Sequence, residues 1–188
     1  MQPILLADGG ELLYDEKFLP AEIADRYFAE LREGCAWEQK PGLFGYPQPR
    51  LIASYGDAGI SYRYSGVENI ALPWTKVLLE IKAQIEGVAG KYNYCLLNLY
   101  RHGSDSMGWH ADDEPEMGNI IASLSLGATR RFRLRHNTTR ETMVFDLPHG
   151  SLLIMAGTTQ QFWQHEVTKT KRVVGERINL TFREVRTM

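Results

Sequence analysis

The strongest constraint on the fold is a segment near the end of the chain in which polar and apolar side chains alternate without exception. It reads Arg177-Ile178-Asn179-Leu180-Thr181-Phe182-Arg183. Because successive side chains of a β-strand point to opposite faces, this pattern predicts a strand with one apolar and one polar face. The apolar face must be buried, so the strand belongs to a sheet that covers a core. The polar face would be exposed to solvent or line an enclosed cavity, and the pattern alone leaves both open.

Short strand-like segments of this kind fill the second half of the chain. Such strands, separated by turns, predict an all-β barrel or sandwich. The predicted strands are Tyr92–Tyr100, Ile120–Leu126, Arg131–Arg135, Thr142–Leu147, Ser151–Met155 and Arg177–Arg183. Before them, apolar residues at helical spacing predict two helices, Pro20–Glu33 and about Pro73–Val88, which would pack on the outside.

Length and composition bound the class of protein. The 188 residues predict one domain, and we expect a monomer. The net charge of -2 argues against a strongly basic nucleic-acid-binding protein. No apolar run approaches the ~20 residues of a membrane helix, and a signal-peptide pattern is absent. We therefore expect a cytoplasmic protein (nuclear if the source is a eukaryote), in which Cys35 and Cys95 are buried reduced thiols.

The segment Trp109-His110-Ala111-Asp112 offers two candidate metal ligands. On an extended segment, residues two apart point to the same side, so an imidazole and a carboxylate would meet at one point. Two imidazoles and one carboxylate suit non-haem Fe(II). Taken alone, the pair also fits a surface loop with two solvated polar residues.

A third ligand would have to come from a later histidine. His149 lies in a Pro-His-Gly turn and is better explained as a turn residue. His165 follows large aromatic residues at the predicted start of a strand, which fits a ligand at the mouth of a pocket. We therefore favour His165.

Two further polar pairs are candidates for binding a small dianion. Arg177 and Arg183 could bracket it, because a guanidinium grips a carboxylate in a bidentate fork. Asn98 and Tyr100 share a strand face amid apolar neighbours and could complete a carboxylate site. The alternatives are a surface strand with solvated arginines and a polar pair on an edge strand.

Together these residues resemble the AlkB family of Fe(II)- and 2-oxoglutarate-dependent dioxygenases. The motifs that carry the resemblance are Asn98-Leu99-Tyr100, Asp105, His110-Ala111-Asp112, His165 and the segment 177–183. Residues upstream look like the nucleotide-recognition part of the double-stranded-DNA repair members. They are Pro49-Arg50, Tyr55-Gly56-Asp57 and Tyr62-Arg63-Tyr64-Ser65-Gly66.

The resemblance implies a double-stranded β-helix, or jelly roll, as residues 92–188, with the helices and the nucleotide-recognition region in residues 1–91. It implies Fe(II) held by His110, Asp112 and His165. The distal carboxylate of 2-oxoglutarate would pair with Arg177 and Tyr100, and the carboxylate near the metal with Arg183 and Asn98. Asn179 and Thr181 would support the same pocket.

The implied reaction is demethylation of N-alkylated bases in DNA, such as 1-methyladenine and 3-methylcytosine, with O2 as oxidant and succinate, CO2 and formaldehyde as products. By resemblance, Tyr62-Arg63-Tyr64 would contact the extruded base, Phe44 would fill its gap in the stack, and Asp113 or Glu114 would bind its exocyclic amine. Tyr62 and Tyr64 fit core packing equally well. The basic runs 130–135 and 169–172 are candidate phosphate contacts or simply solvated faces.

Two rival interpretations remain open. One is a related dioxygenase that acts on RNA, protein or a small molecule, which the acids and the tyrosines disfavour. The other is an inactive jelly-roll binding module, which predicts broken metal ligands, whereas the sequence has all three.

Overall fold

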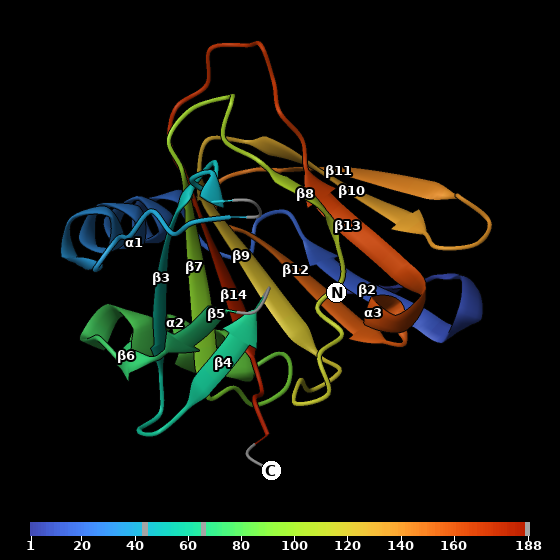
Figure 1. Ribbon diagram of the computed structural model, residues 1–188, viewed down its shortest axis with the longest axis horizontal. Coiled ribbons are helices and arrows are strands. Elements are labelled where there is room, and N and C mark those ends of the chain that lie inside the picture. The colour runs from blue at the N-terminus through green and yellow to red at the C-terminus, as the bar shows by residue number, and fades with distance from the viewer. Residues whose placement is uncertain (43–44, 65–66, 187–188) are drawn as a thin grey trace.

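The computed structural model describes residues 1–42, 45–64 and 67–186, but not the side chains of residues 62–64 and 67–69. Its main feature is a pair of facing sheets, which confirms the predicted strand-rich jelly roll (Figure 1). In spatial order, the strands of the larger sheet are β1 (Pro3–Leu5), β2 (Gly10–Asp15), β12 (Ser151–Gly157), β9 (Ile121–Gly127), β14 (Arg177–Arg183), β7 (Tyr94–Tyr100), β3 (Leu51–Gly56) and β6 (Leu72–Pro73). Those of the smaller sheet are β11 (Thr142–Leu147), β10 (Arg130–His136), β13 (Trp163–Val167) and β8 (Met107–His110).

Besides the 3-10 helix η1 (Ala7–Gly9), three α-helices and a hairpin complete the fold of the described residues. They are α1 (Ala21–Gly34), α2 (Lys76–Glu86), the short α3 (Thr159–Phe162) and the hairpin of β4 (Ser61–Tyr64) with β5 (Val67–Ile70). In Figure 1 both long helices lie on the same side of the larger sheet, away from β10 and β11. Among the described residues, none of the helices is long and apolar enough to cross a membrane.

The segment 177–183 forms β14, with the predicted bounds, in the middle of the larger sheet. Ile178, Leu180 and Phe182 are fully buried in a core that also contains the apolar residues of α1 and α2. The helices therefore pack on the outer face, as predicted. The polar face of β14 is buried as well, so the question that the pattern left open is answered in favour of an enclosed cavity.

The helix boundaries differ slightly from the prediction. Pro20 is the N-cap residue of α1 instead of lying in its first turn. α2 begins only at Lys76, because the Thr75 side chain accepts the backbone N–H of Leu78 and caps the helix there. Pro73 belongs to the two-residue edge strand β6, where its missing N–H costs nothing.

Several strands were not predicted at all. β1 and β2 extend the larger sheet through pairing of β2 with β12, so residues from before position 91 share a sheet with the core. Toward the opposite edge of the larger sheet, β3 pairs with β7. His165 lies in the middle of β13, not at the start of a strand. Both cysteines are free thiols; Cys95 is buried as predicted, but Cys35 is only partly buried.

Candidate active site

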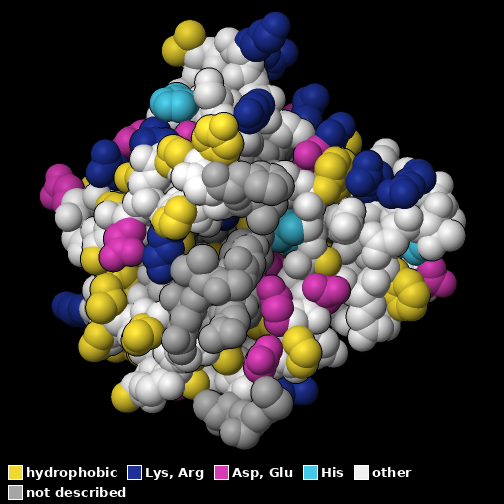
Figure 2. Space-filling view, in the orientation of Figure 1, with side chains coloured by type: hydrophobic (Ala, Val, Ile, Leu, Met, Phe, Trp, Pro, Cys, Tyr) yellow, Lys and Arg dark blue, Asp and Glu magenta, His cyan; other side chains and the backbone are white. Residues whose placement is uncertain are grey.

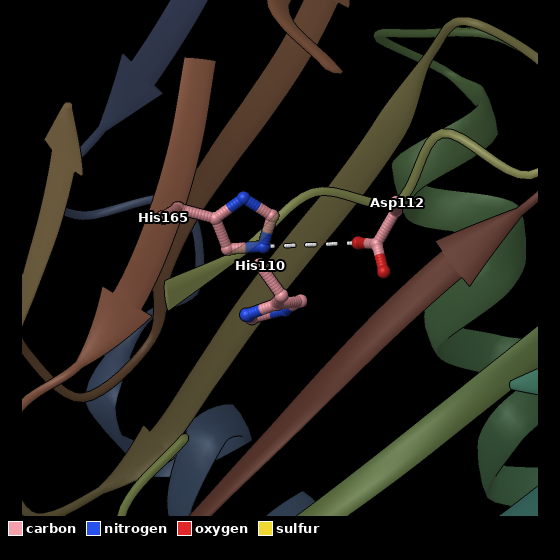
Figure 3. A group of neighbouring side chains, drawn as sticks. All are labelled: His110, Asp112 and His165. Atoms are coloured by element: carbon pink, nitrogen blue, oxygen red, sulfur yellow. Dashed lines mark ion pairs between the residues drawn. The ribbon is translucent and has the colours of Figure 1, made fainter. Parts of the chain in front are cut away.

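Three side chains converge between the two sheets. His110 is the last residue of β8, and Asp112 follows two residues later. β13 runs antiparallel to β8 and places His165 directly opposite His110, with ring centroids 4.2 Å apart. Each of the three offers a ligand atom, and these atoms all lie within 4.8 Å of one another (Figure 3). The structure thus brings together the three predicted metal ligands.

The alternative histidine lies elsewhere. His149 Nδ1 accepts a hydrogen bond from the backbone N–H of Gly127 at 2.7 Å. Its Nε2 lies 3.1 Å from a carboxylate oxygen of Asp25 on α1. His149 therefore ties a turn to a helix, as its position in a Pro-His-Gly turn indicated.

The electrostatics keep the three candidate ligands in the protonation states that a metal requires. Burial lowers the pKa of His165 to about 3, and burial also lowers the pKa of His110, so both imidazoles are neutral near pH 7. Burial would raise the pKa of Asp112, but the charge of Arg183, with smaller electrostatic contributions from the two histidines, outweighs it and lowers the pKa. Asp112 is therefore a carboxylate.

The donor set fits Fe(II). Two imidazoles and one carboxylate on one side of a point leave the opposite positions open for a co-substrate and O2. Asp112 Oδ2 is buried without a hydrogen bond to any described residue, and His165 Nε2 lies 3.7 Å from it. A buried carboxylate oxygen without a donor is costly unless a cation satisfies it.

Arg177 supplies a buried cation at the far end of the same face. It is 1% exposed, and it lies opposite Tyr100 with its guanidinium 5.3 Å from the ring centroid. Nη2 donates to Ser125 Oγ at 2.9 Å, but Nε and Nη1 have no acceptor among the described residues. Burial lowers the pKa of Arg177 to about 10, so it is still charged at neutral pH. A buried charged guanidinium with spare donors fits a carboxylate ligand.

The sheet register sets the remaining polar side chains between the metal ligands and Arg177. Asn98 on β7 lies opposite Asn179 on β14, which lies opposite Ser125 on β9. A cavity of about 30 Å³ separates the side chains. Its polar lining includes Asn98, Tyr100, Ser123, Asn179, Thr181 and Arg183 together with the three candidate metal ligands. Met107 and Met155 also line it, and flexible thioether side chains can yield the space that a five-carbon diacid needs.

Three buried polar residues in or beside this cavity were not predicted from the sequence to belong to it. Ser123 and Ser125 alternate with leucines on β9. Only the pairing of β9 with β14 shows that these serines lie on the polar, inward face of the sheet. The resemblance places Arg50 in the nucleotide-recognition part; in the structure it is 6% exposed, and its Nε donates to Asn98 Oδ1 at 2.7 Å.

Comparison with known proteins agrees with this geometry. Residues 11–183 match the 2OG-Fe(II) oxygenase superfamily. The chain is 44% identical over 184 residues to alpha-ketoglutarate-dependent dioxygenase alkB homolog 3 from Bos taurus, a match that covers 89% of this chain and 64% of that protein. It is 39% identical over 196 residues to the human DNA oxidative demethylase ALKBH2, covering 95% of this chain and 75% of that one. This chain belongs to the AlkB family of 2OG-Fe(II) oxygenases. The name of this superfamily gives Fe(II) and 2-oxoglutarate as the metal and co-substrate of its members, in agreement with the predicted set of Fe(II), 2-oxoglutarate and O2.

Solved structures support the fold of this AlkB-family chain. OsALKBH1 superimposes with a TM-score of 0.60 at 22% identity, covering 92% of this chain and 97% of that one. A Pseudomonas putida prolyl-4-hydroxylase superimposes with a TM-score of 0.62 at 18% identity, covering 94% and 93%. The chain spans just under two thirds of the length of alkB homolog 3.

The predicted base contacts of this AlkB-family member are only partly visible. Asp113 is exposed and Glu114 is half-buried, directly after the ligand Asp112. Figure 2 shows acidic side chains gathered beside a histidine near the centre of this face. Phe44 and the side chains of 62–64 lie outside the described residues, so their predicted roles stay predictions.

The two basic runs occupy different settings. On β10, Arg131 pairs with Asp146 at 3.0 Å and Arg133 pairs with Glu166. Arg135 stacks over the Trp109 ring, 4.2 Å from its centroid. The loop 168–176, which projects at the upper edge of the molecule in Figure 1, instead leaves its basic side chains exposed, and Figure 2 shows Lys and Arg side chains at that edge. Its Lys169 and Arg172 line a groove of about 320 Å³ with Arg130 and Arg131.

Proposed function

We propose that this chain is an oxidative demethylase of N-alkylated bases in DNA. The observation that carries the proposal is the convergence of His110, Asp112 and His165 at one point, beside a polar cavity lined by Tyr100, which lies opposite Arg177 in the sheet. With all three proposed ligands and both arginines present, and with only His110 among them less than fully buried, an inactive binding module is disfavoured. The relatives named DNA oxidative demethylase support DNA as the substrate.

The chain's own residues bind and orient the reactants. His110, Asp112 and His165 would hold Fe(II). Arg177 would bind the distal carboxylate of 2-oxoglutarate, with Arg183 and Asn98 at the carboxylate nearer the metal, supported by Asn179 and Thr181. When bound, Fe(II) lets O2 oxidise 2-oxoglutarate to succinate and CO2 and hydroxylate the N-methyl group, which then leaves as formaldehyde. The protein contributes positioning and a site shielded from water.

The base would reach the metal by leaving the duplex. Asp113 and Glu114 follow Asp112 in the chain and would place negative charge beside the metal site. A base alkylated at a ring nitrogen is cationic, so this charge favours the lesion over the intact base. Tyr62 and Tyr64 would stack on the extruded base, Arg63 would contact it, and Phe44 would fill the gap left in the stack.

The loop 168–176 would bind the phosphate backbone. Lys169, Lys171 and Arg172 are exposed, and the nearby groove adds further cations. Such contacts give affinity without sequence preference, which suits an enzyme that searches for lesions.

The test is incubation with Fe(II), 2-oxoglutarate and O2 and an oligonucleotide containing 1-methyladenine, as single-stranded DNA, double-stranded DNA or RNA. We expect formaldehyde and unmodified adenine from DNA. His110→Ala should abolish both, whereas His102→Ala, an exposed histidine outside the cavity, should not. Turnover on RNA alone would make RNA the substrate, and absence of 2-oxoglutarate turnover with every substrate would leave a binding module.

Two further expectations accompany this proposal. A monomer is expected, and gel filtration with light scattering at assay concentration would show it. A cytoplasmic location, or a nuclear one in a eukaryote, is expected, and fluorescence microscopy of a tagged chain would test it.

A further inference from the structure

We propose that Arg50 is a positioning residue that fixes the side-chain amide of Asn98 so that its NH2 group points into the cavity. There the amide would donate to the 2-oxoglutarate carboxylate nearer the metal, so the inference rests on the proposed function. Arg50 precedes β3 and is 6% exposed, while Asn98 on β7 is 3% exposed. The Nε of Arg50 donates to Asn98 Oδ1 at 2.7 Å, and this hydrogen bond is buried.

The chemistry of the guanidinium makes this hydrogen bond directional. An arginine side chain has five N–H donors and no acceptor, whereas an asparagine amide has one oxygen and one NH2 group. Only Oδ1 can therefore face Arg50, and Nδ2 must point the other way. A flipped Asn98 would set N–H against N–H and would also turn a carbonyl oxygen toward the incoming carboxylate. Arg50 thus determines whether Asn98 attracts or repels the co-substrate.

Asn98 is available for this role, unlike the neighbouring asparagine. Asn179 lies opposite Asn98 in the sheet, but its Nδ2 donates to Ser123 Oγ at 2.8 Å and to the Leu124 carbonyl at 3.0 Å. Within the described part of the chain, the bond to Arg50 is the one hydrogen bond found for the Asn98 side chain. Asn98 also lines the cavity with the metal ligands.

The backbone around Arg50 is held in place by contacts on both sides. In the pairing of β3 with β7, Ile52 lies opposite Asn98, so Arg50 lies one pleat further along the same face. The preceding Pro49 carbonyl accepts from the Ser106 N–H at 3.0 Å, which joins this segment to the loop leading into β8. The guanidinium is therefore presented from a fixed backbone.

The test measures 2-oxoglutarate binding to the Mn(II)-loaded protein by calorimetry, so that no turnover is required. Arg50→Met removes the donors but keeps much of the side chain, and we expect the Kd for 2-oxoglutarate to rise about tenfold, since a hydrogen bond to a charged partner is lost. The Kd for Mn(II) alone should be unchanged. Arg50→Lys keeps a donor and the charge and should recover part of the affinity. The matched control is Arg26→Met, an arginine in ion pairs on the surface of α1, which should bind as the wild type does.

The decisive comparison is a double-mutant cycle. If Arg50 acts through Asn98, then adding Arg50→Met to Asn98→Ala should weaken 2-oxoglutarate binding no further. Additive losses would overturn the inference, as would wild-type affinity in Arg50→Met. If Arg50→Met does not fold, Asn98→Asp tests the same idea, because it keeps the acceptor for Arg50 but has no donor for the co-substrate; unchanged affinity there would also refute it. A wild-type protein that binds Mn(II) but no 2-oxoglutarate would instead refute the proposed function, and this inference with it.

Discussion

Arg183 Nη2 lies 3.0 Å from Oδ1 of Asp112, and the side chains are 3% and 1% exposed. At one end of the polar face of β14, Arg183, which is proposed to bind 2-oxoglutarate, thus forms an ion pair with Asp112, which is proposed to bind the metal. The pair joins the larger sheet to the segment after β8, and it is the main reason why a fully buried Asp112 keeps a lowered pKa. Metal site and co-substrate site are therefore coupled through one guanidinium.

Removal of this guanidinium should destabilise the protein strongly. Arg183→Met leaves the Asp112 carboxylate buried without its closest cation, and such losses cost about 3–5 kcal/mol of unfolding free energy. Arg183→Lys should lose less, because it keeps the charge. Urea denaturation measures both. Mn(II) should stabilise Arg183→Met more than it stabilises the wild type, since the ion restores positive charge beside Asp112; equal stabilisation would argue against Asp112 as a ligand.

Arg177 should determine the preference for a dicarboxylate. 2-Oxopentanoate has the same carbon chain as 2-oxoglutarate but no distal carboxylate, so it cannot use the spare donors of Arg177. Arg177→Met should weaken 2-oxoglutarate binding by about 10- to 100-fold, the loss expected for one or two charge-assisted hydrogen bonds. It should leave 2-oxopentanoate binding nearly unchanged. Calorimetry on the Mn(II)-loaded protein gives both values, and an equal loss for both ligands would place Arg177 away from the distal carboxylate.

The ion pair of Arg101 with Asp105 should set part of the stability at low pH. Arg101 Nε lies 2.8 Å from an oxygen of Asp105, which is 3% exposed. Burial raises the pKa of Asp105, but hydrogen bonds from Arg101 outweigh this and lower it below its ordinary value. The stabilisation is therefore complete above the unfolded-state pKa of about 3.9 and is lost as the pH falls through the lower folded-state value. Asp105→Asn should flatten the acid side of a plot of Tm against pH, whereas Glu33→Gln, an exposed acid on α1, should not.

The sequence was informative wherever a local pattern decides the structure. The alternation in 177–183 fixes both the bounds of β14 and the face that lines the cavity. The spacing of His110 and Asp112 was sufficient to pair them. The local signals that favour His165 over His149 as the third ligand are weaker, and it is the antiparallel pairing of β13 with β8 that brings His165 beside His110.

The features that the sequence did not predict depend on partners far along the chain. β2 is too short and too mixed in character to be recognised without β12, with which it pairs about 140 residues later. The serines of β9 look like ordinary strand residues until β14 lies beside them. The hydrogen bond of Arg50 with Asn98 joins residues 48 positions apart, and no local pattern encodes it.

The loop 168–176 should supply much of the salt-dependent affinity for DNA. Its backbone packs against the loop after β7 through the Thr170 N–H and the Gly103 carbonyl at 2.8 Å, so Lys171 and Arg172 extend from a supported edge. Each phosphate contact contributes about 0.9 to the slope of log K against log salt concentration, so Lys171→Ala with Arg172→Ala should reduce that slope by about 2. Fluorescence anisotropy with a 1-methyladenine oligonucleotide measures it. The control is Lys76→Ala with Lys91→Ala, which removes the same number of positive charges elsewhere. Lys76 is on α2, and Lys91 precedes β7, so it lies at the opposite end of that strand from the loop. This double variant should leave the slope unchanged. If both pairs reduce the slope equally, DNA responds only to the net charge and the loop makes no specific phosphate contact.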